Sequence, residues 1–260
     1  MNTKLPFIPE RTVKERNSGL TMMMDKGLSL AEAESFVESS GEFSDMVKFG
    51  FGTAVFAKKN KEKIKLYRSA GLHPYFGGTL FEAFIVRNMF DEFRKFISDS
   101  GLEMVEVSDG SMKIEHEEKL KYVNELSKDF RVLSEVGSKV KGVELEPDEW
   151  VRNMKTELEN GAWKVIAEAR ESGTIGIYNQ DGSANIEIID DIIEHVAVEN
   201  VIWEAPNKAQ QVWFINLIGA NVNLGNIAPA EVVALEALRL GLRGDTFFNY
   251  LPEQYHDKKL

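Results

Sequence analysis

The chain contains no cysteine among its 260 residues. It therefore cannot form disulfides, zinc–thiolate centres or cysteine-ligated iron–sulfur clusters, and it cannot use a thiol nucleophile. Basic residues are also few, since 31 Lys and Arg stand against 42 Asp and Glu and give a formal net charge of −11. This balance argues against general nucleic-acid binding, which needs a basic surface. A small anionic substrate is still compatible with it, because the charge around one site can oppose the net charge.

Long apolar segments are absent as well. No run approaches the roughly 20 apolar residues of a membrane span, and the charged residues 1–16 lack the apolar stretch of a signal peptide. We therefore expect no membrane partner and a cytoplasmic location. Because no linker divides the chain, we expect one domain over 1–260, with an amino-terminal arm over 1–18 and a carboxy-terminal extension over 244–260.

Short apolar runs alternate with longer amphipathic stretches along the chain. The runs predict eight strands, at residues 20–25, 45–50, 72–76, 103–108, 130–135, 164–169, 200–203 and 212–218. Their starts lie about 27 residues apart on average, the spacing of strand–helix units with right-handed crossovers. Eight such units predict a closed (β/α)8 TIM barrel, with a doubly wound open sheet as the alternative. The last two predicted strands are so close that little room is left for a helix between them.

Helix boundaries are marked by local signals. Ser29 with Glu32, and Thr79 with Glu82, have the spacing of capping boxes at helix starts. Glycines 71, 101 and 161 each stand just before a predicted strand, where a helix often ends in a left-handed residue. These signals support the strand–helix alternation.

Charged residues close six of the predicted strands, although the strands of such a barrel are buried on both faces. They are Asp25, Lys48, Glu106, Glu135, Glu168 and Glu204. Burying ionisable groups is costly unless they pair or bind something, and the carboxy-terminal strand ends form the active-site face of a barrel. The pattern predicts an enzyme site. The alternative is a set of ion pairs without a ligand, such as Lys48 with Glu106 or Glu168 with Arg170.

Carboxylates on neighbouring strand ends favour a hard divalent cation. Glu106, Glu135 and Glu168 come from three successive strands, so we predict that they bind Mg²⁺. Asp109 is a weaker candidate because a turn separates it from Glu106. With only four histidines in the chain, a histidine-based transition-metal site is not expected.

A segment rich in glycine and asparagine follows the last predicted strand. It contains Gly219, Asn221 and Asn223 and leads toward a helix near Pro229. Backbone N–H groups and helix amino-termini attract phosphate, and barrels often bind phosphate after strands seven and eight. We therefore predict a phosphate site here, while noting that Gly and Asn are also ordinary loop residues. Gly77 and Gly78 suit either an anion or a tight turn.

Several segments together resemble the phosphosulfolactate synthase family. In order they are RTVK at 11–14, GLTMMMDKG at 19–27, VKFGFGT at 47–53, GGTLFE at 77–82, VEVSDG at 105–110, VLSEVG at 132–137 followed by Lys139, and NVNLGNI at 221–227. The resemblance implies a (β/α)8 lyase that uses Mg²⁺ to join sulfite to phosphoenolpyruvate, giving (2R)-O-phospho-3-sulfolactate. That reaction is the first step of one route to coenzyme M. The resemblance also implies a homo-oligomer.

The family's lysine-bearing motif points to Lys139 as the general acid that protonates carbon, with Lys48 as the alternative. The family usually has Lys-Lys after Val-Gly, whereas Ser138 precedes Lys139 here. Mg²⁺ would stabilise the enolate as a Lewis acid, and Arg170, Lys48 and Arg11 are available for the anionic substrates. The arm that carries Arg11 and Arg16 either crosses the barrel mouth or is solvated.

Two other functions stay open at this point. One is a lyase or isomerase that acts on another phosphorylated enol acid with the same metal and phosphate sites. The other is a noncatalytic member of the family, of the kind linked to heat stress.

Overall fold

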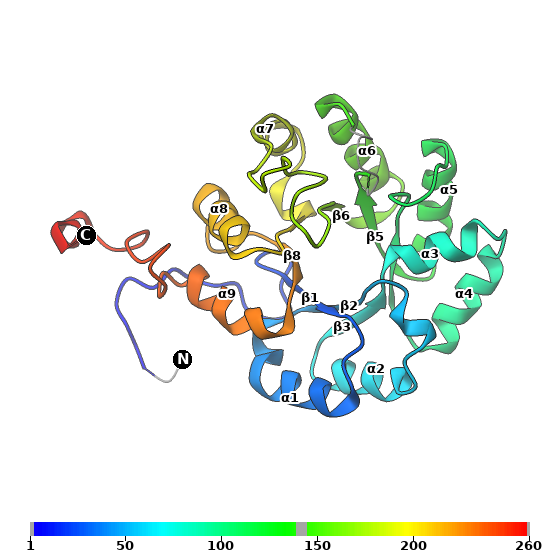
Figure 1. Ribbon diagram of the computed structural model, residues 1–260, viewed down its shortest axis with the longest axis horizontal. Helices are drawn as coiled ribbons and strands as arrows, with labels where there is room; N and C mark the ends of the chain where they lie inside the picture. The colour runs from blue at the N-terminus through cyan, green and yellow to red at the C-terminus, as the bar shows by residue number, and fades with distance from the viewer. Residues whose placement is uncertain (1–2, 139–144, 259–260) are drawn as a thin grey trace.

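The computed structural model describes residues 3–138 and 145–258. Within these residues, eight parallel strands pair in the order β3-β2-β1-β8-β7-β6-β5-β4. The end strands β3 and β4 are in contact, so the sheet closes into a nearly complete barrel ringed by helices (Figure 1). The strands are β1 Thr21–Asp25, β2 Met46–Phe49, β3 His73–Phe76, β4 Met104–Val107, β5 Arg131–Val136, β6 Ala162–Ala167, β7 Val201–Glu204 and β8 Leu224–Ile227. The predicted TIM barrel is confirmed.

Helices alternate with these strands. They are α1 Leu30–Ser40, α2 Asn60–Ser69, α3 Gly78–Ile85, α4 Phe90–Asp99, α5 His116–Ser127, α6 Pro147–Glu159, α7 Ile186–His195, α8 Lys208–Ile218 and α9 Val232–Arg239. Short 3-10 turns occur at Gly41–Phe43, Thr53–Val55, Val198–Asn200, Pro229–Glu231 and Glu253–Lys258. Throughout the described part of the chain, no helix is both long enough and apolar enough to span a bilayer.

The predicted helix signals are confirmed at most positions. Ser29 and Glu32 form a reciprocal capping box at the start of α1, and the three predicted terminator glycines have φ of 71°, 73° and 110°. The box predicted for Thr79 and Glu82 is wrong, because α3 begins at Gly78 instead. Glu82 is buried and accepts hydrogen bonds from the Ser108 hydroxyl and the Ser111 N–H. It thereby ties α3 to the loop after β4.

The prediction for the eighth strand is also wrong. Residues 212–218 lie in α8, and β8 is Leu224–Ile227. A short apolar run fits a buried helix as well as a buried strand, so periodicity alone misassigned it. The overlooked signal is Asn207 with Gln210, which form a capping box at the start of α8. The correction supplies the helix missing from the seventh strand–helix unit.

Apolar side chains form two layers on the two faces of the barrel wall. The larger layer lies between the strands and the helices. The smaller fills the barrel interior and consists of Leu20, Met22, Met24, Met46, Tyr75, Met104, Leu133, Ile166 and Ile202. Side chains alternate along a strand, so the residue two positions after an interior one also faces inward. By this rule Lys48, Glu106, Glu135, Glu168 and Glu204 continue the interior face, whereas Asp25 lies on the outer face.

Candidate functional site

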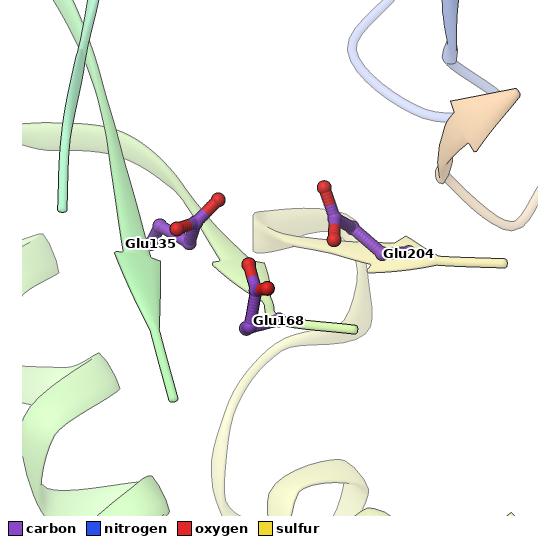
Figure 2. Close-up of side chains that lie close together, drawn as sticks. All are labelled: Glu135, Glu168 and Glu204. Atoms are coloured by element: carbon purple, nitrogen blue, oxygen red, sulfur yellow. The ribbon is translucent and has the colours of Figure 1, made fainter. Parts of the chain in front are cut away.

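Three glutamates meet at the carboxy-terminal end of the barrel. Glu135 comes from β5, Glu168 directly follows β6, and Glu204 ends β7. One carboxylate oxygen from each lies within 4.8 Å of the other two, and the residues are 1–2% exposed. Figure 2 shows the three carboxylates turned toward one another. Of the predicted metal ligands, the structure therefore brings Glu135 and Glu168 together and adds Glu204.

Lys48 lies among carboxylates of this site. Its Nζ is 3.0 Å from Glu106 Oε1, 3.0 Å from Glu135 Oε2 and 3.4 Å from Glu204 Oε1. Burial opposes the charge, but the three carboxylates outweigh it and raise the pKa of Lys48 well above its ordinary value. Lys48 therefore stays protonated at physiological pH. The predicted pair with Glu106 exists, as one part of a larger network.

Glu106 is held differently from the other glutamates. Its Oε1 accepts a hydrogen bond from the Gly78 N–H, at the amino-terminus of α3, where the helix dipole favours a negative charge. A Cβ on Gly78 would lie 2.4 Å from Ser108 Oγ and 2.9 Å from Glu106 Oε1, so only glycine permits this approach. The anion that Gly77 and Gly78 were suited to bind is thus the carboxylate of Glu106, a residue of the chain itself. Among the residues that the structure describes, the carboxylates close enough together to bind one metal ion include Glu204 and do not include Glu106, which was predicted as a ligand.

Glu204 carries a carboxylate with a perturbed pKa. Its Oε2 accepts hydrogen bonds from the Ala169 N–H at 3.0 Å and from Asn226 Nδ2 at 3.4 Å. Burial raises the pKa of Glu204 to about 7; Lys48 opposes this effect, and repulsion from Glu135 adds to it. The site therefore holds a carboxyl whose charge changes near neutral pH, which is a property of functional sites.

Asn226 is a site residue that the sequence analysis missed. It lies in β8 with φ of 59°, a left-handed conformation that costs free energy for most residues but less for Asn. Its buried Nδ2 bridges the Ala169 carbonyl, at 3.1 Å, and the Glu204 carboxylate. The misplaced eighth strand hid this residue, because residue 226 was then assigned to a loop.

Asp25 takes no part in the cluster, although its position at a strand end suggested otherwise. On the outer face of β1 it accepts hydrogen bonds from Lys63 Nζ at 2.7 Å and the Tyr67 hydroxyl at 3.0 Å. The N–H groups of Gly27 and Leu28 also donate to it, each at 2.8 Å. These contacts join β1 to α2 and make Asp25 a structural residue.

Among the residues that the structure describes, Asp109 and Arg170 are further charged candidates, and neither belongs to the cluster of three glutamates. Asp109 pairs with Lys119 at 2.9 Å, and Lys119 pairs with buried Glu157 at 2.9 Å on the outer side of β5. Arg170 is exposed in the loop after β6. Lys139, the predicted general acid, lies outside the described residues.

The segment from Gly219 to Asn223 lies at the opposite end of the barrel from the glutamates. Gly219 ends α8 and therefore precedes β8. Asn223 accepts a hydrogen bond from the Leu20 N–H at 3.0 Å and donates to the Val201 carbonyl at 3.1 Å, where β1 and β7 begin. The predicted placement of Gly219, Asn221 and Asn223 on the active-site face is wrong, because it depended on the misassigned strand.

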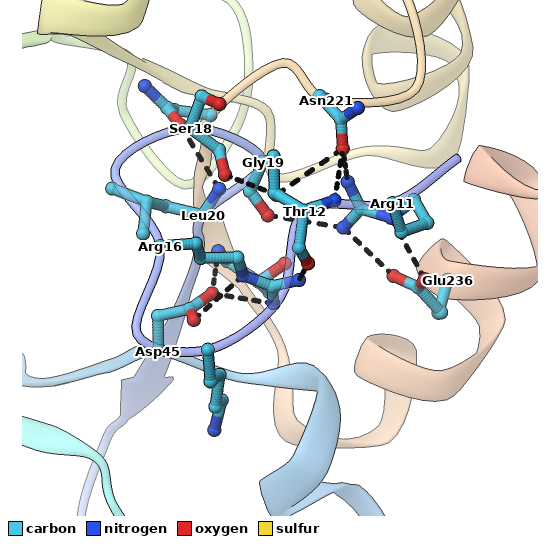
Figure 3. Close-up of polar contacts among 12 residues, drawn as sticks. Arg11, Thr12, Arg16, Ser18, Gly19, Leu20, Asp45, Asn221 and Glu236 are labelled. Atoms are coloured by element: carbon cyan, nitrogen blue, oxygen red, sulfur yellow. Dashed lines mark hydrogen bonds and ion pairs between the residues drawn. The ribbon is translucent and has the colours of Figure 1, made fainter. Parts of the chain in front are cut away.

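The amino-terminal arm crosses this same end. Arg11 pairs with Glu236 at 2.9 Å and donates hydrogen bonds to Asn221 Oδ1 and the Gly19 carbonyl (Figure 3). Arg16 pairs with Asp45 through two nitrogens, each at 2.9 Å. Arg11 is thus engaged in holding the arm to the amino-terminal end, and its predicted placement at the substrate site is wrong.

Most of the chain is similar in sequence to one family of enzymes. Residues 9–245 match the family described as (2R)-phospho-3-sulfolactate synthase (ComA). The chain belongs to this enzyme family. It is 43% identical to the phosphosulfolactate synthase of Methanothermobacter thermautotrophicus over 92% of this chain and 95% of that one. It is 42% identical to the phosphosulfolactate synthase of Bacillus subtilis over 93% and 97% of the two chains.

Solved structures with the same fold are much more distant in sequence from this family member. 3-Hexulose-6-phosphate synthase from Salmonella typhimurium is 14% identical with a TM-score of 0.54, over 86% of this chain and all of that one. A phosphonopyruvate hydrolase in complex with oxalate and Mg²⁺ is 13% identical with a TM-score of 0.52, over 85% and 79%. At these identities the similarity establishes the barrel fold of the chain, and nothing about its chemistry.

Proposed function

We propose that the chain is a Mg²⁺-dependent phosphosulfolactate synthase, which adds sulfite to phosphoenolpyruvate to give (2R)-O-phospho-3-sulfolactate. The observation that carries the proposal is the cluster of Glu135, Glu168 and Glu204 beside Lys48. It lies at the active-site end of a barrel whose curated relatives are named for this activity. The chemistry of these residues and the activity named for the relatives therefore support the same function.

The three glutamates fit a magnesium ion. They offer hard oxygen donors, and their oxygens already lie within 4.8 Å of one another. Burial and repulsion among the carboxylates raise the pKa of Glu204, so a cation that neutralises the cluster would be bound favourably. Bound there, Mg²⁺ would act as a Lewis acid toward the charge that develops on the substrate carboxylate.

Lys48 supports the proposed reaction as a fixed positive charge. Its ammonium orients Glu106, Glu135 and Glu204 through short contacts and favours an anionic substrate. A general acid works best with a pKa near the operating pH, whereas the pKa of Lys48 is raised well above its ordinary value. Lys48 is therefore poorly suited to release a proton, and Lys139 stays our proposed acid.

The proposed reaction forms one C–S bond and transfers one proton to carbon. Sulfite forms a C–S bond to the methylene carbon of phosphoenolpyruvate, and the electron pair of the double bond moves toward the carboxylate. The carbon beside that carboxylate then takes one proton, which we assign to the Lys139 ammonium. No redox partner is needed, since the addition consumes one sulfite and one proton for each product formed.

The direct test incubates the purified chain with Mg²⁺, sulfite and phosphoenolpyruvate and follows phosphorus by NMR. We expect both substrates to be consumed and one new phosphate ester to appear, with no turnover by Glu135→Gln. Glu194→Gln, an exposed residue of α7, is the matched control and should remain active. If no ester forms while the folded chain still binds phosphoenolpyruvate, the synthase proposal fails, and other phosphorylated enol acids become the substrates to screen.

A further inference from the structure

Two adjoining cavities open at the amino-terminal end of the barrel, opposite the glutamate cluster. Their volumes are about 190 and 390 Å³, and both are lined by Glu15, Gly71, His73 and Arg131. The first also reaches Lys14 of the arm. The proposed synthase reaction uses none of these residues.

Arg131 differs from the other arginines of these cavities in its contacts. It begins β5, is exposed, and places its guanidinium carbon 4.6 Å from the centre of the Trp163 ring. Stacking on an aromatic face occupies the face of a guanidinium and leaves its in-plane N–H donors for another partner. No carboxylate within residues 3–138 or 145–258 forms an ion pair with Arg131. Two other arginines that line the cavities do have such partners: Arg16 pairs with Asp45, and Arg68 with Glu103.

Burial disfavours the charged forms of the basic groups around Arg131. Burial lowers the pKa of His73, and Arg131 lowers it further against the opposing effects of Glu15, Glu103 and Asp45. Burial also lowers the pKa of Lys164 to about 8, with Glu199 opposing and Arg131 contributing. For Lys14, burial is again the largest cause of a lowered pKa; Asp45 and Glu42 oppose it, while Arg16 adds to it. A bound anion would favour the charged forms of these groups and so oppose the effect of burial.

We propose that the amino-terminal end of the barrel is a second binding site, which takes a small organic anion through its phosphate or carboxylate group. Arg131 supplies the paired N–H donors that match such a group, and Lys14 and His73 line the same cavity. Glu135 lies four positions after Arg131 in β5, which is about 13 Å along an extended strand. The site is therefore distinct from the glutamate cluster and independent of the proposed reaction.

The test uses the imidazole NMR signals, because the chain has four histidines and only His73 lines these cavities. His73→Gln assigns the signal. Inorganic phosphate and acetate are titrated separately, so that the two anionic groups are compared. We expect at least one of them to shift the His73 signal saturably and raise its pKa, without moving the other three histidines.

Variants decide whether Arg131 binds the anion. Arg131→Gln should weaken the titration about tenfold or more, the loss expected for a charge-assisted hydrogen bond. Arg152→Gln on α6, which pairs with Glu149, is the matched control and should titrate like the parent. Lys14→Gln on the arm should weaken binding about threefold, and it tests the site even if Arg131→Gln fails to fold.

Three results would overturn the proposal. The first is a His73 signal that neither anion moves. The second is an equal response of all four histidines, which would show a general ionic-strength effect. The third is a signal that follows the concentration of the chain instead of the anion, which would identify this end as a contact between two copies.

Discussion

Replacing Glu204 by glutamine tests the electrostatics of the glutamate cluster without the reaction itself. The pKa of Glu204 is raised from its ordinary 4.5 to about 7 in the folded chain. At about 1.4 kcal/mol per pH unit, that difference costs the metal-free chain on the order of 3 kcal/mol of unfolding free energy once the group is ionised. The side chain is 2% exposed, so solvent screens little of this cost.

The sign of the pH dependence follows from proton binding. Between pH 4.5 and 7 the folded chain holds more of the Glu204 proton than the unfolded chain does, so stability falls as pH rises through this window. The loss is complete above about pH 7. Glu204→Gln carries no titrating group at this position, so its stability should lack this fall. At pH 8 and without metal, the variant should be the more stable chain by about 2–3 kcal/mol.

Urea unfolding from pH 5 to 8.5, with and without Mg²⁺, measures both effects. For the parent at pH 8, Mg²⁺ at a hundredfold excess over its dissociation constant should add about 2.7 kcal/mol, whereas the variant should gain much less. Glu194→Gln on the exposed face of α7 controls for the loss of one carboxylate. Parallel stability curves for parent and Glu204→Gln, or equal gains from Mg²⁺, would refute the assignment of Glu204 to the cluster.

Substitutions at four other positions test separate parts of the structure. Lys48→Met leaves buried carboxylates without their cation, so kinetics and urea unfolding should show at least 100-fold lower kcat/KM and about 3 kcal/mol lower stability. Asn226→Ala removes the hydrogen-bond donor to Glu204 and places alanine in a left-handed conformation, so it should weaken Mg²⁺ binding about tenfold and lower stability by roughly 1–2 kcal/mol. Asn226→Gly should restore the stability but not the Mg²⁺ binding, because glycine tolerates this conformation and lacks the donor. Arg11→Gln should lower stability by roughly 1–3 kcal/mol and leave the KM for phosphoenolpyruvate unchanged. A raised KM without a loss of stability would show that Arg11 contacts the substrate after all. Lys63→Met leaves the buried Asp25 carboxylate without its cation, so it should lower the free energy of unfolding by about 3 kcal/mol without moving the midpoint of the Mg²⁺ titration. A moved midpoint would connect Asp25 to the cluster.

Seven of the eight strands could be located from the sequence, because buried parallel strands are short apolar runs with clear boundaries. The eighth could not, since β8 reads LGNI and contains only two apolar side chains, whereas α8 contains the apolar run VWFINLI. This one error displaced Gly219, Asn221 and Asn223 to the wrong end of the barrel. It also concealed Asn226, the residue that holds Glu204.

Patterns along the chain were sufficient to recognise the family and to predict the barrel and a site rich in carboxylates. Strand–helix periodicity predicts the fold, and charged residues at the ends of the predicted strands predict that carboxylates and a lysine lie on the active-site face. Which of these groups lie in contact depends on the packing of the folded chain. The amino-terminus of α3 binds Glu106 through the Gly78 N–H, while the neighbouring strands β7, β5 and β6 bring Glu204 to Glu135 and Glu168. Contacts across a closed barrel depend on strand register and on the approach of each helix, and neither is visible in the spacing of residues along the chain.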